Sequence, residues 1–140
     1  MSVVDSCGQP ERVPMHTILV VDDSPDSCTV LAKLLTMMGD KALCVLSGQL
    51  ALDSLQRRIP SLVILDVMMP DMDGMEVLRR IRIEPKTAHL PVVMFSAIDD
   101  PGYADYAKGM GATDFWMKGR MDFSKLHQLV APYMALPAAA

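Results

Sequence analysis

The sequence predicts an α/β fold in which helices cover both faces of a five-stranded parallel sheet. Two observations lead to this fold: five short, almost unbroken apolar runs, and segments with helical spacing between them. The runs cover residues 17–21, 42–46, 62–65, 91–95 and 113–117. Unbroken apolar runs are typical of strands buried on both faces, and their alternation with helices along the chain is typical of a doubly wound sheet.

The segments between the runs carry apolar residues at steps of three and four, the period of an α-helix. The clearest of them covers 26–38 and is followed by Gly39, which favours a stop. A last helix is predicted to start near Asp122 or Ser124 and to be stopped or kinked by Pro132. The other predicted helices cover 48–58, 74–83 and 101–108.

Length and composition limit the chain to one domain and exclude several classes of protein. Its 140 residues are 51% apolar, enough for a substantial core. The 13 Lys and Arg residues against 17 Asp and Glu residues give a net charge of −4, unlike the basic excess of nucleic-acid-binding proteins. No apolar stretch approaches the roughly 20 residues that span a bilayer. The first fifteen residues carry acids and prolines rather than a basic end and an apolar block, so we do not expect a signal peptide there. We therefore expect a soluble, cytoplasmic domain without direct nucleic-acid or membrane partners.

Both ends of the chain lack a periodic apolar pattern. Residues 1–16 are predicted to be a flexible lead-in, residues 17–134 the folded domain and residues 135–140 a frayed tail.

The three cysteines are Cys7, Cys28 and Cys44, an odd number without C-x-x-C spacing. This pattern favours buried free thiols in a reducing compartment over a disulfide framework or a zinc site.

Polar residues follow four of the five predicted strands. Asp22 and Asp23 follow the first, Asp66 the third, Ser96 the fourth and Lys118 the fifth. In a parallel sheet these ends meet at one edge, where ligands bind. Three converging carboxylates need a neutralising cation, and Mg²⁺ prefers oxygen ligands of this kind. A lysine and a hydroxyl beside the metal suit a phosphoryl group, and a carboxylate can itself attack phosphorus to form an acyl phosphate.

Two motifs resemble the receiver domain of two-component response regulators: Asp66-Val-Met-Met-Pro-Asp-Met-Asp-Gly74, and before it Ile18-Leu-Val-Val-Asp-Asp23. The resemblance extends from about Thr17 to Met134. It rests on several separated features that follow one another in the family's order. These are the acidic pair, the central Asp66 with a Pro four residues later and a Gly eight residues later, the hydroxyl of Ser96 and the lysine Lys118. It implies a flavodoxin-like sheet with strand order 2-1-3-4-5.

The resemblance also implies roles for the residues at the strand ends. Asp66 is expected to be the phospho-acceptor. Asp22, Asp23, Asp66 and the backbone carbonyl of Met68 are expected to bind Mg²⁺. The residues themselves, and not the resemblance, give the roles of Asp71 and Asp73: the third acid and the closing Glu of a calcium loop are missing, so both are expected to be turn and N-cap residues for the helix that follows.

Ser96 and Lys118 take the positions at which the family contacts the phosphoryl group, and Phe115 takes the aromatic switch position. The implied function is to accept a phosphoryl group from a histidine kinase or phosphotransfer protein, without being an enzyme in its own right. Ser96 and Phe115 would then switch the face of helix 4, strand 5 and helix 5 toward a downstream partner, with a homodimer as one outcome.

Two departures from the family pattern concern the end of the fifth strand. Lys118 is followed by Gly119, where the family has a proline in a cis peptide. Since a cis bond to a non-proline residue costs about 3–4 kcal/mol, we expect a trans bond with a rearranged loop or a strained cis bond. Phe115 lacks the hydroxyl of the commoner tyrosine and therefore cannot bond a partner through it.

A third departure concerns hydrolysis. Met68 lies two residues after Asp66, and Ile98 lies two residues after Ser96, so both flank the path of the attacking water. Apolar side chains there exclude water and fail to orient it, and we therefore expect a long-lived aspartyl phosphate.

Two other functions fit parts of the pattern. A degenerate receiver would act as a phosphorylation-independent docking or dimerisation module, for which Gly119 is the only support. A small phosphatase or phosphotransferase would use an Asp nucleophile on a soluble substrate. That class needs a pocket or cap, and the five strand-helix repeats leave little chain to build one.

Overall fold

Five parallel strands form one sheet in the computed structural model, which describes residues 16–134. The order across the sheet is β2-β1-β3-β4-β5, and each neighbouring pair is parallel. This confirms the predicted order 2-1-3-4-5. The strands are β1 (Thr17–Val21), β2 (Lys41–Val45), β3 (Leu62–Leu65), β4 (Val92–Ser96) and β5 (Asp114–Met117).

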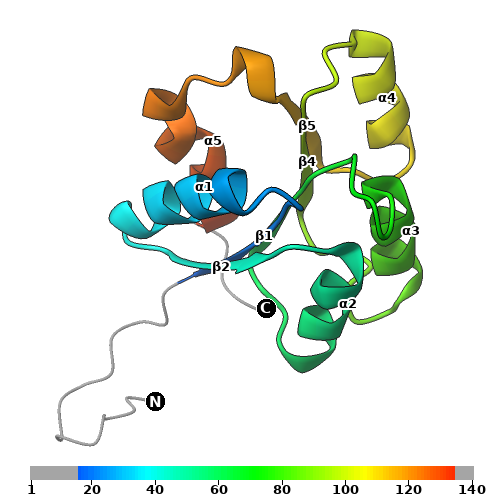
Figure 1. Ribbon diagram of the computed structural model, residues 1–140. Coiled ribbons are helices and arrows are strands. Elements are labelled where there is room, and N and C mark those ends of the chain that lie inside the picture. The colour runs from blue at the N-terminus through cyan, green and yellow to red at the C-terminus, as the bar shows by residue number, and fades with distance from the viewer. Residues whose placement is uncertain (1–15, 135–140) are drawn as a thin grey trace, which may run out of the picture.

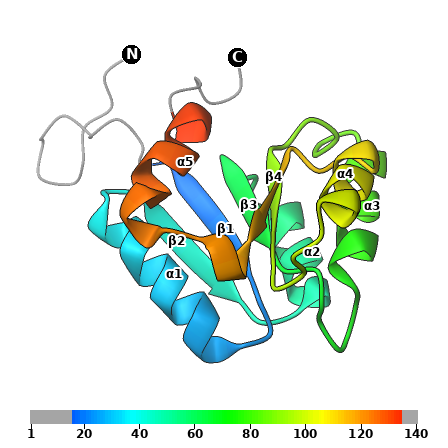
Figure 2. The same ribbon diagram turned by 90° about the horizontal axis from the view of Figure 1, so that it is seen from above.

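A helix follows each strand, so the chain alternates between sheet and helix throughout. Helices α1 and α5 cover one face of the sheet, whereas α2, α3 and α4 cover the other (Figures 1 and 2). Four helices begin at a Ser or Asp whose side chain accepts a hydrogen bond from the first turn, as N-cap residues do. The helices are α1 (Pro25–Met37), α2 (Gly48–Arg57), α3 (Gly74–Ile83), α4 (Pro101–Gly109) and α5 (Leu126–Met134).

The sheet separates two apolar cores, because successive side chains of a strand point to opposite faces. In β1, Ile18 packs into the core beneath α1 and α5, and Leu19 packs into the core beneath α2, α3 and α4. Phe115 and Trp116 divide between the two cores in the same way. The strand β2 is more exposed than its apolar sequence predicts, because it lies at the edge of the sheet.

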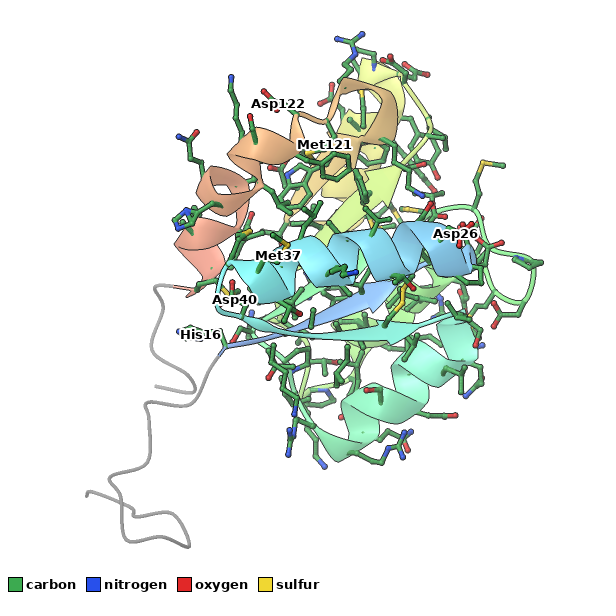
Figure 3. All side chains as sticks on the ribbon, turned by 60° about the vertical axis from the view of Figure 1, so that its left-hand side comes forward. His16, Asp26, Met37, Asp40, Met121 and Asp122 are labelled. Atoms are coloured by element: carbon green, nitrogen blue, oxygen red, sulfur yellow. A yellow bond between two sulfur atoms is a disulfide. The ribbon has the colours of Figure 1, made fainter. Side chains whose placement is uncertain are left out.

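The segment between β5 and α5 differs from the prediction. It contains two 3₁₀ turns, Lys118–Arg120 and Phe123–Lys125, and the helix begins only at Leu126. Asp122 caps the second turn by accepting a hydrogen bond from the Ser124 N–H at 3.0 Å. Met121 and Asp122 lie in this segment above α1 (Figure 3). Of the two predicted effects of Pro132, the stop is wrong, since α5 contains this proline and continues to Met134.

The prediction of free thiols is wrong for two of the cysteines. Cys28 in α1 and Cys44 in β2 form a disulfide, with their Cα atoms 5.8 Å apart. The two residues are 16 positions apart in sequence, and they meet because α1 lies along β2. Sequence spacing carries no signal for such a pair. Cys7, residues 1–15 of the predicted lead-in 1–16 and the whole predicted tail 135–140 lie outside the described residues.

Within residues 16–134, every helix is too short or too polar to cross a membrane.

Candidate functional site

The parallel pairing of β1 with β3 brings three carboxylates together at one edge of the sheet. Val21 and Leu65 are register partners at the ends of these strands, so the next residues, Asp22 and Asp66, lie beside each other. Main-chain hydrogen bonds hold both of them: the Asp66 N–H donates to the Val21 carbonyl at 2.9 Å, and the Asp22 N–H donates to β2 at 3.1 Å. Carboxylate oxygens of Asp22, Asp23 and Asp66 all lie within 4.8 Å of one another.

Lys118 is the cation that balances this cluster. Its Nζ donates to Asp22 Oδ2 at 2.8 Å and lies 3.5 Å from Asp66 Oδ2. Asp22 and Asp66 are buried, whereas Asp23 is exposed. Burial raises the pKa of Asp66; the positive charge of Lys118 opposes the rise, and the neighbouring Asp22 carboxylate adds to it. One lysine thus faces three acidic groups, which leaves the cluster with an excess of negative charge.

Lys118 reaches the carboxylates from the first residue after β5. No peptide bond within residues 16–134 is cis, so Lys118–Gly119 is trans and a 3₁₀ turn follows, which confirms one of the two predicted geometries. The lysine Nζ lies 5.5 Å from the centroid of the Phe95 ring, a cation–π arrangement. Phe95 in turn meets Trp116 edge to face, with ring centroids 6.4 Å apart.

Ser96 and Phe115 occupy different surroundings. Ser96 ends β4 and is completely buried, and its Oγ accepts a hydrogen bond from the Ile98 N–H at 3.1 Å. Phe115 lies in the core beneath α4, where its ring meets Tyr103 with centroids 5.8 Å apart. The structure therefore brings the three carboxylates and the lysine into contact, places the serine at a nearby strand end, and places the phenylalanine away from the charged cluster.

The two apolar side chains predicted to flank the water path differ in exposure. Met68 is 67% exposed, whereas Ile98 is partly buried and packs against the core beneath α4. The Met68 N–H donates to Asp66 Oδ1 at 3.4 Å, which ties the segment after β3 back to the central carboxylate.

Asp71 has a role that the sequence did not reveal. Its carboxylate accepts hydrogen bonds from the backbone N–H groups of Gly48 and Gln49, both at 3.2 Å. Asp71 therefore provides acceptors for free N–H groups at the start of α2, not at the start of α3. Asp73 is the N-cap of α3, as predicted, and accepts from the Met75 N–H at 2.8 Å. Desolvation works against ionisation of Asp71, but backbone N–H donors at the start of α2 and within the loop together outweigh it and lower the pKa of this carboxyl.

Gly74 is required at the start of α3, because the helix approaches β3 very closely there. A Cβ atom at this position would overlap the Asp66 carbonyl oxygen and would lie 2.8 Å from the Val67 Cα. The Gly74 N–H also donates to the Val67 carbonyl at 2.7 Å, which closes the base of the loop after β3. The loop therefore holds Asp66 and Met68 in a fixed relation.

The donor set fits a hard divalent cation. Carboxylate oxygens from three residues, with more negative charge than one lysine neutralises, are the ligands that Mg²⁺ prefers. In the described part of the chain, this is the one group of three acidic or metal-ligating side chains close enough to share an ion.

Comparison with known proteins gives the family. The model of the response regulator receiver domain matches residues 18–131. The chain belongs to this family. A receiver domain is a signalling module of two-component systems, so the predicted family and the predicted fold are both confirmed.

Relatives of this receiver domain include longer regulators. It is 40% identical over 103 residues to the response regulator PleD of Caulobacter vibrioides, covering 72% of this chain and 22% of PleD. It is 36% identical over 106 residues to the transcriptional regulatory protein AfsQ1 of Streptomyces coelicolor, covering 74% of this chain and 45% of AfsQ1. The chain therefore spans less than half the length of either relative.

Solved receiver domains share the whole fold. The BeF3-activated N-terminal receiver domain of RstA from Klebsiella pneumoniae aligns with a TM-score of 0.78 at 26% identity. The alignment covers 86% of this chain and 99% of the RstA domain.

Proposed function

We propose that this receiver domain accepts a phosphoryl group on Asp66 from a phosphohistidine of a histidine kinase or phosphotransfer protein. Asp22, Asp23, Asp66 and the Met68 carbonyl would hold Mg²⁺. The observation that carries the proposal is the cluster itself: three carboxylates within 4.8 Å of one another, and a lysine Nζ 3.5 Å from Asp66 Oδ2. Family membership supports the same chemistry.

The transfer is a single displacement at phosphorus. An Asp66 carboxylate oxygen attacks the phosphorus, the P–N bond to the donor imidazole breaks, and the imidazole leaves with the bonding electron pair. Mg²⁺ held by the three carboxylates would supply positive charge to the phosphoryl oxygens. Lys118, already 2.8 Å from Asp22, supplies a further positive charge, and the Ser96 hydroxyl donates a hydrogen bond to a phosphoryl oxygen.

Phosphorylation would act as a switch through Ser96 and Phe115. When the Ser96 hydroxyl turns toward the phosphoryl group, it gives up its present hydrogen bond with the Ile98 N–H. The phosphorylated state then favours a second arrangement of α4, β5 and α5, and a downstream protein or a second copy of this chain binds that arrangement. Phe115 would follow by rotation of its ring, without a hydroxyl to bond the partner. We expect this to take place in the cytoplasm.

The phosphorylated form is proposed to be long-lived. Met68 and Ile98 flank the approach to Asp66, and neither side chain is able to orient a water molecule by hydrogen bonding. Loss of the phosphoryl group within seconds would contradict this part of the proposal.

One observation favours a second function, that of a phosphorylation-independent docking module. Gly119 leaves the loop after Lys118 without the constraint of a proline, so the lysine is held less firmly than the family pattern implies. Such a domain would present the same face of α4, β5 and α5 constitutively.

Phosphorylation by acetyl phosphate separates the two functions. Wild type, Asp66→Asn and Asp105→Asn are incubated with acetyl phosphate and Mg²⁺, and the intact mass is measured; Asp105 is an exposed carboxylate on α4 and serves as the matched control. We expect the wild type and the control to gain the mass of one phosphoryl group and Asp66→Asn to gain none. A folded wild type that gains none from several donors would favour the docking module.

A further inference from the structure

An ion pair joins the segment that follows Ser96 at the end of β4 to the segment that begins with Lys118. Arg120 Nη2 lies 2.9 Å from Asp99 Oδ1, and Arg120 Nε donates to Asp99 Oδ2 at 3.1 Å, so the guanidinium meets both carboxylate oxygens. Such a two-point contact fixes orientation as well as distance. Asp99 lies three residues after Ser96, and Arg120 lies two residues after Lys118.

The loop after β5 has few other restraints near the lysine. Nothing lies within 4 Å of the position that a Cβ atom on Gly119 would occupy. The 3₁₀ turn is closed by one long hydrogen bond, from the Met121 N–H to the Lys118 carbonyl at 3.3 Å. Met121 then packs against the core between α1 and α5, where Figure 3 shows it above α1. Between the lysine and Met121, the ion pair is therefore the contact that ties the turn to the rest of the site.

We propose that Arg120 and Asp99 are positioning residues that hold Lys118 over Asp66 for phosphoryl transfer. This inference rests on the proposed phosphorylation of Asp66. Asp71 restrains the loop after β3 through two hydrogen bonds to α2. The Arg120–Asp99 pair restrains the loop after β5 in a similar way, through two contacts with the segment after β4. Displacement of a charged group by about 1 Å is enough to slow a reaction, because transfer requires near-attack geometry.

The exposure of the pair separates its effect on reaction from its effect on stability. The Arg120 side chain is 68% exposed and that of Asp99 is 46% exposed. Exposed ion pairs contribute little to folding, since water and salt screen them. Loss of the pair should therefore leave the melting temperature almost unchanged while the rate of phosphorylation falls.

The test compares five proteins in acetyl phosphate saturation curves with Mg²⁺: wild type, Arg120→Gln, Asp99→Asn, the double variant, and the charge exchange Asp99→Arg with Arg120→Asp. We expect each single variant to lower the maximal rate by about twofold to fivefold, the range typical of an exposed pair, with little change in the half-saturating concentration. The double variant should be no slower than either single variant. The charge exchange should recover most of the wild-type rate.

Glu76→Gln is the matched control. Glu76 binds Arg79 and Arg80 at 2.7 and 2.9 Å, and both ion pairs lie within α3. Its loss should not change the rate. Single variants as fast as the wild type, single effects that multiply in the double variant, or a folded charge-exchange variant that stays slow would each overturn the inference.

A second readout does not depend on phosphorylation. The ¹⁵N relaxation order parameter of the Gly119 amide should fall in both single variants and recover in the charge exchange, because the pair restrains this turn. An unchanged order parameter would overturn the inference. A wild type that is never phosphorylated would instead refute the proposed function, and the order parameter would still decide whether the pair fixes the loop.

Discussion

The loops after β3 and β5 both supply a charged group to the same site, yet the structure holds them very differently. The loop after β3 is closed at its base by a hydrogen bond of 2.7 Å from Gly74 to Val67, and Asp71 fixes its tip to α2. The loop after β5 contains Gly119, where nothing lies within 4 Å of the position that a Cβ atom would take, and one exposed ion pair tethers the loop through Arg120.

This difference matches the demands on the two groups. Under the proposed function, Asp66 has to keep one place relative to the other carboxylates throughout transfer, and a rigid loop suits that requirement. Lys118 donates to Asp22 at 2.8 Å and, under the same proposal, would turn its ammonium group toward the phosphoryl group, which a loop with one tether permits. The proposed site thus combines a rigidly held acceptor with a cation on a loop that one exposed ion pair restrains.

The largest expected effect comes from glycine substitutions in the two loops. Gly74→Ala forces a Cβ atom against backbone atoms of Asp66 and Val67, which are unable to rotate away, and should cost about 3 kcal/mol or more in the free energy of unfolding. Gly119→Ala meets nothing within 4 Å and should change it by less than about 0.5 kcal/mol. Urea denaturation of both variants measures the two losses in stability, and equal losses would contradict the proposed difference between the two loops.

Hydrolysis of the phosphorylated form tests what the rigid loop presents beside Asp66. Met68→Asn introduces an amide that orients a water molecule and should speed loss of the phosphoryl group by roughly tenfold, a small part of what a positioned acid or base supplies. Met37→Asn replaces an exposed methionine at the end of α1 and should have no effect. The lifetime of the phosphorylated form is followed by intact mass after removal of the donor. Identical lifetimes in all three proteins would show that the Met68 side chain does not restrict the attack of water on the phosphoryl group.

The charged cluster should be a source of instability that Mg²⁺ relieves. At ten times its dissociation constant, the ion should stabilise the wild type by about 1.4 kcal/mol. In EDTA at neutral pH, Asp66→Asn should melt at a higher temperature than the wild type, because burial raises the pKa of this carboxyl and the charged form therefore weakens the fold.

The sign of the pH dependence follows from the same shift. The pKa of Asp66 in the folded state lies above its ordinary value of 3.8, so the destabilisation develops as the pH rises through the folded-state pKa. The gap in melting temperature between Asp66→Asn and the wild type should be full at neutral pH and close as the pH falls toward 3.8. Asp105→Asn, with an exposed carboxylate, serves as the control, and a gap that widens at low pH would contradict the burial argument.

The smallest expected effect concerns the tether at the tip of the loop after β3. Asp71→Ala removes the acceptor for two N–H groups at the start of α2 and should cost about 0.5–1 kcal/mol, as loss of a helix cap does. Asp105→Ala removes an exposed carboxylate from α4 and should cost less. If calorimetry finds the two variants equally stable, Asp71 does not fasten the loop.

Much of the fold was accessible from the sequence because apolar runs report burial directly. The predicted strands at 62–65 and 17–21 match β3 and β1 at both ends, since both strands are covered by helices on each face. At the edge strand β2 the apolar residues gave the position of the strand but not its exposure, because an apolar run alone does not show that a strand lies at an edge; the strand order came from the resemblance.

The charged residues of the site could be predicted from the sequence for a similar reason, but the contacts that fix their loops could not. Residues directly after strands in a parallel sheet meet at one edge, so Asp22, Asp66 and Lys118 followed from position in the chain. Asp71 accepts hydrogen bonds from two residues of α2 that precede it by 22 and 23 positions in the chain. Arg120 forms an ion pair with Asp99, which precedes it by 21 positions. Such contacts depend on how loops approach one another in space, and no local period or motif encodes them.

The aromatic ring of Phe95 connects Lys118 to a fluorescent side chain, that of Trp116. The lysine Nζ lies 5.5 Å from the Phe95 ring centroid, and Phe95 meets Trp116, the single tryptophan of the chain, edge to face at 6.4 Å. A lysine that leaves Asp22 for a phosphoryl group changes the field at Phe95 and the contact that Phe95 makes with the indole. Under the proposed function, emission from this one tryptophan should therefore report the state of the site in real time, without any label attached.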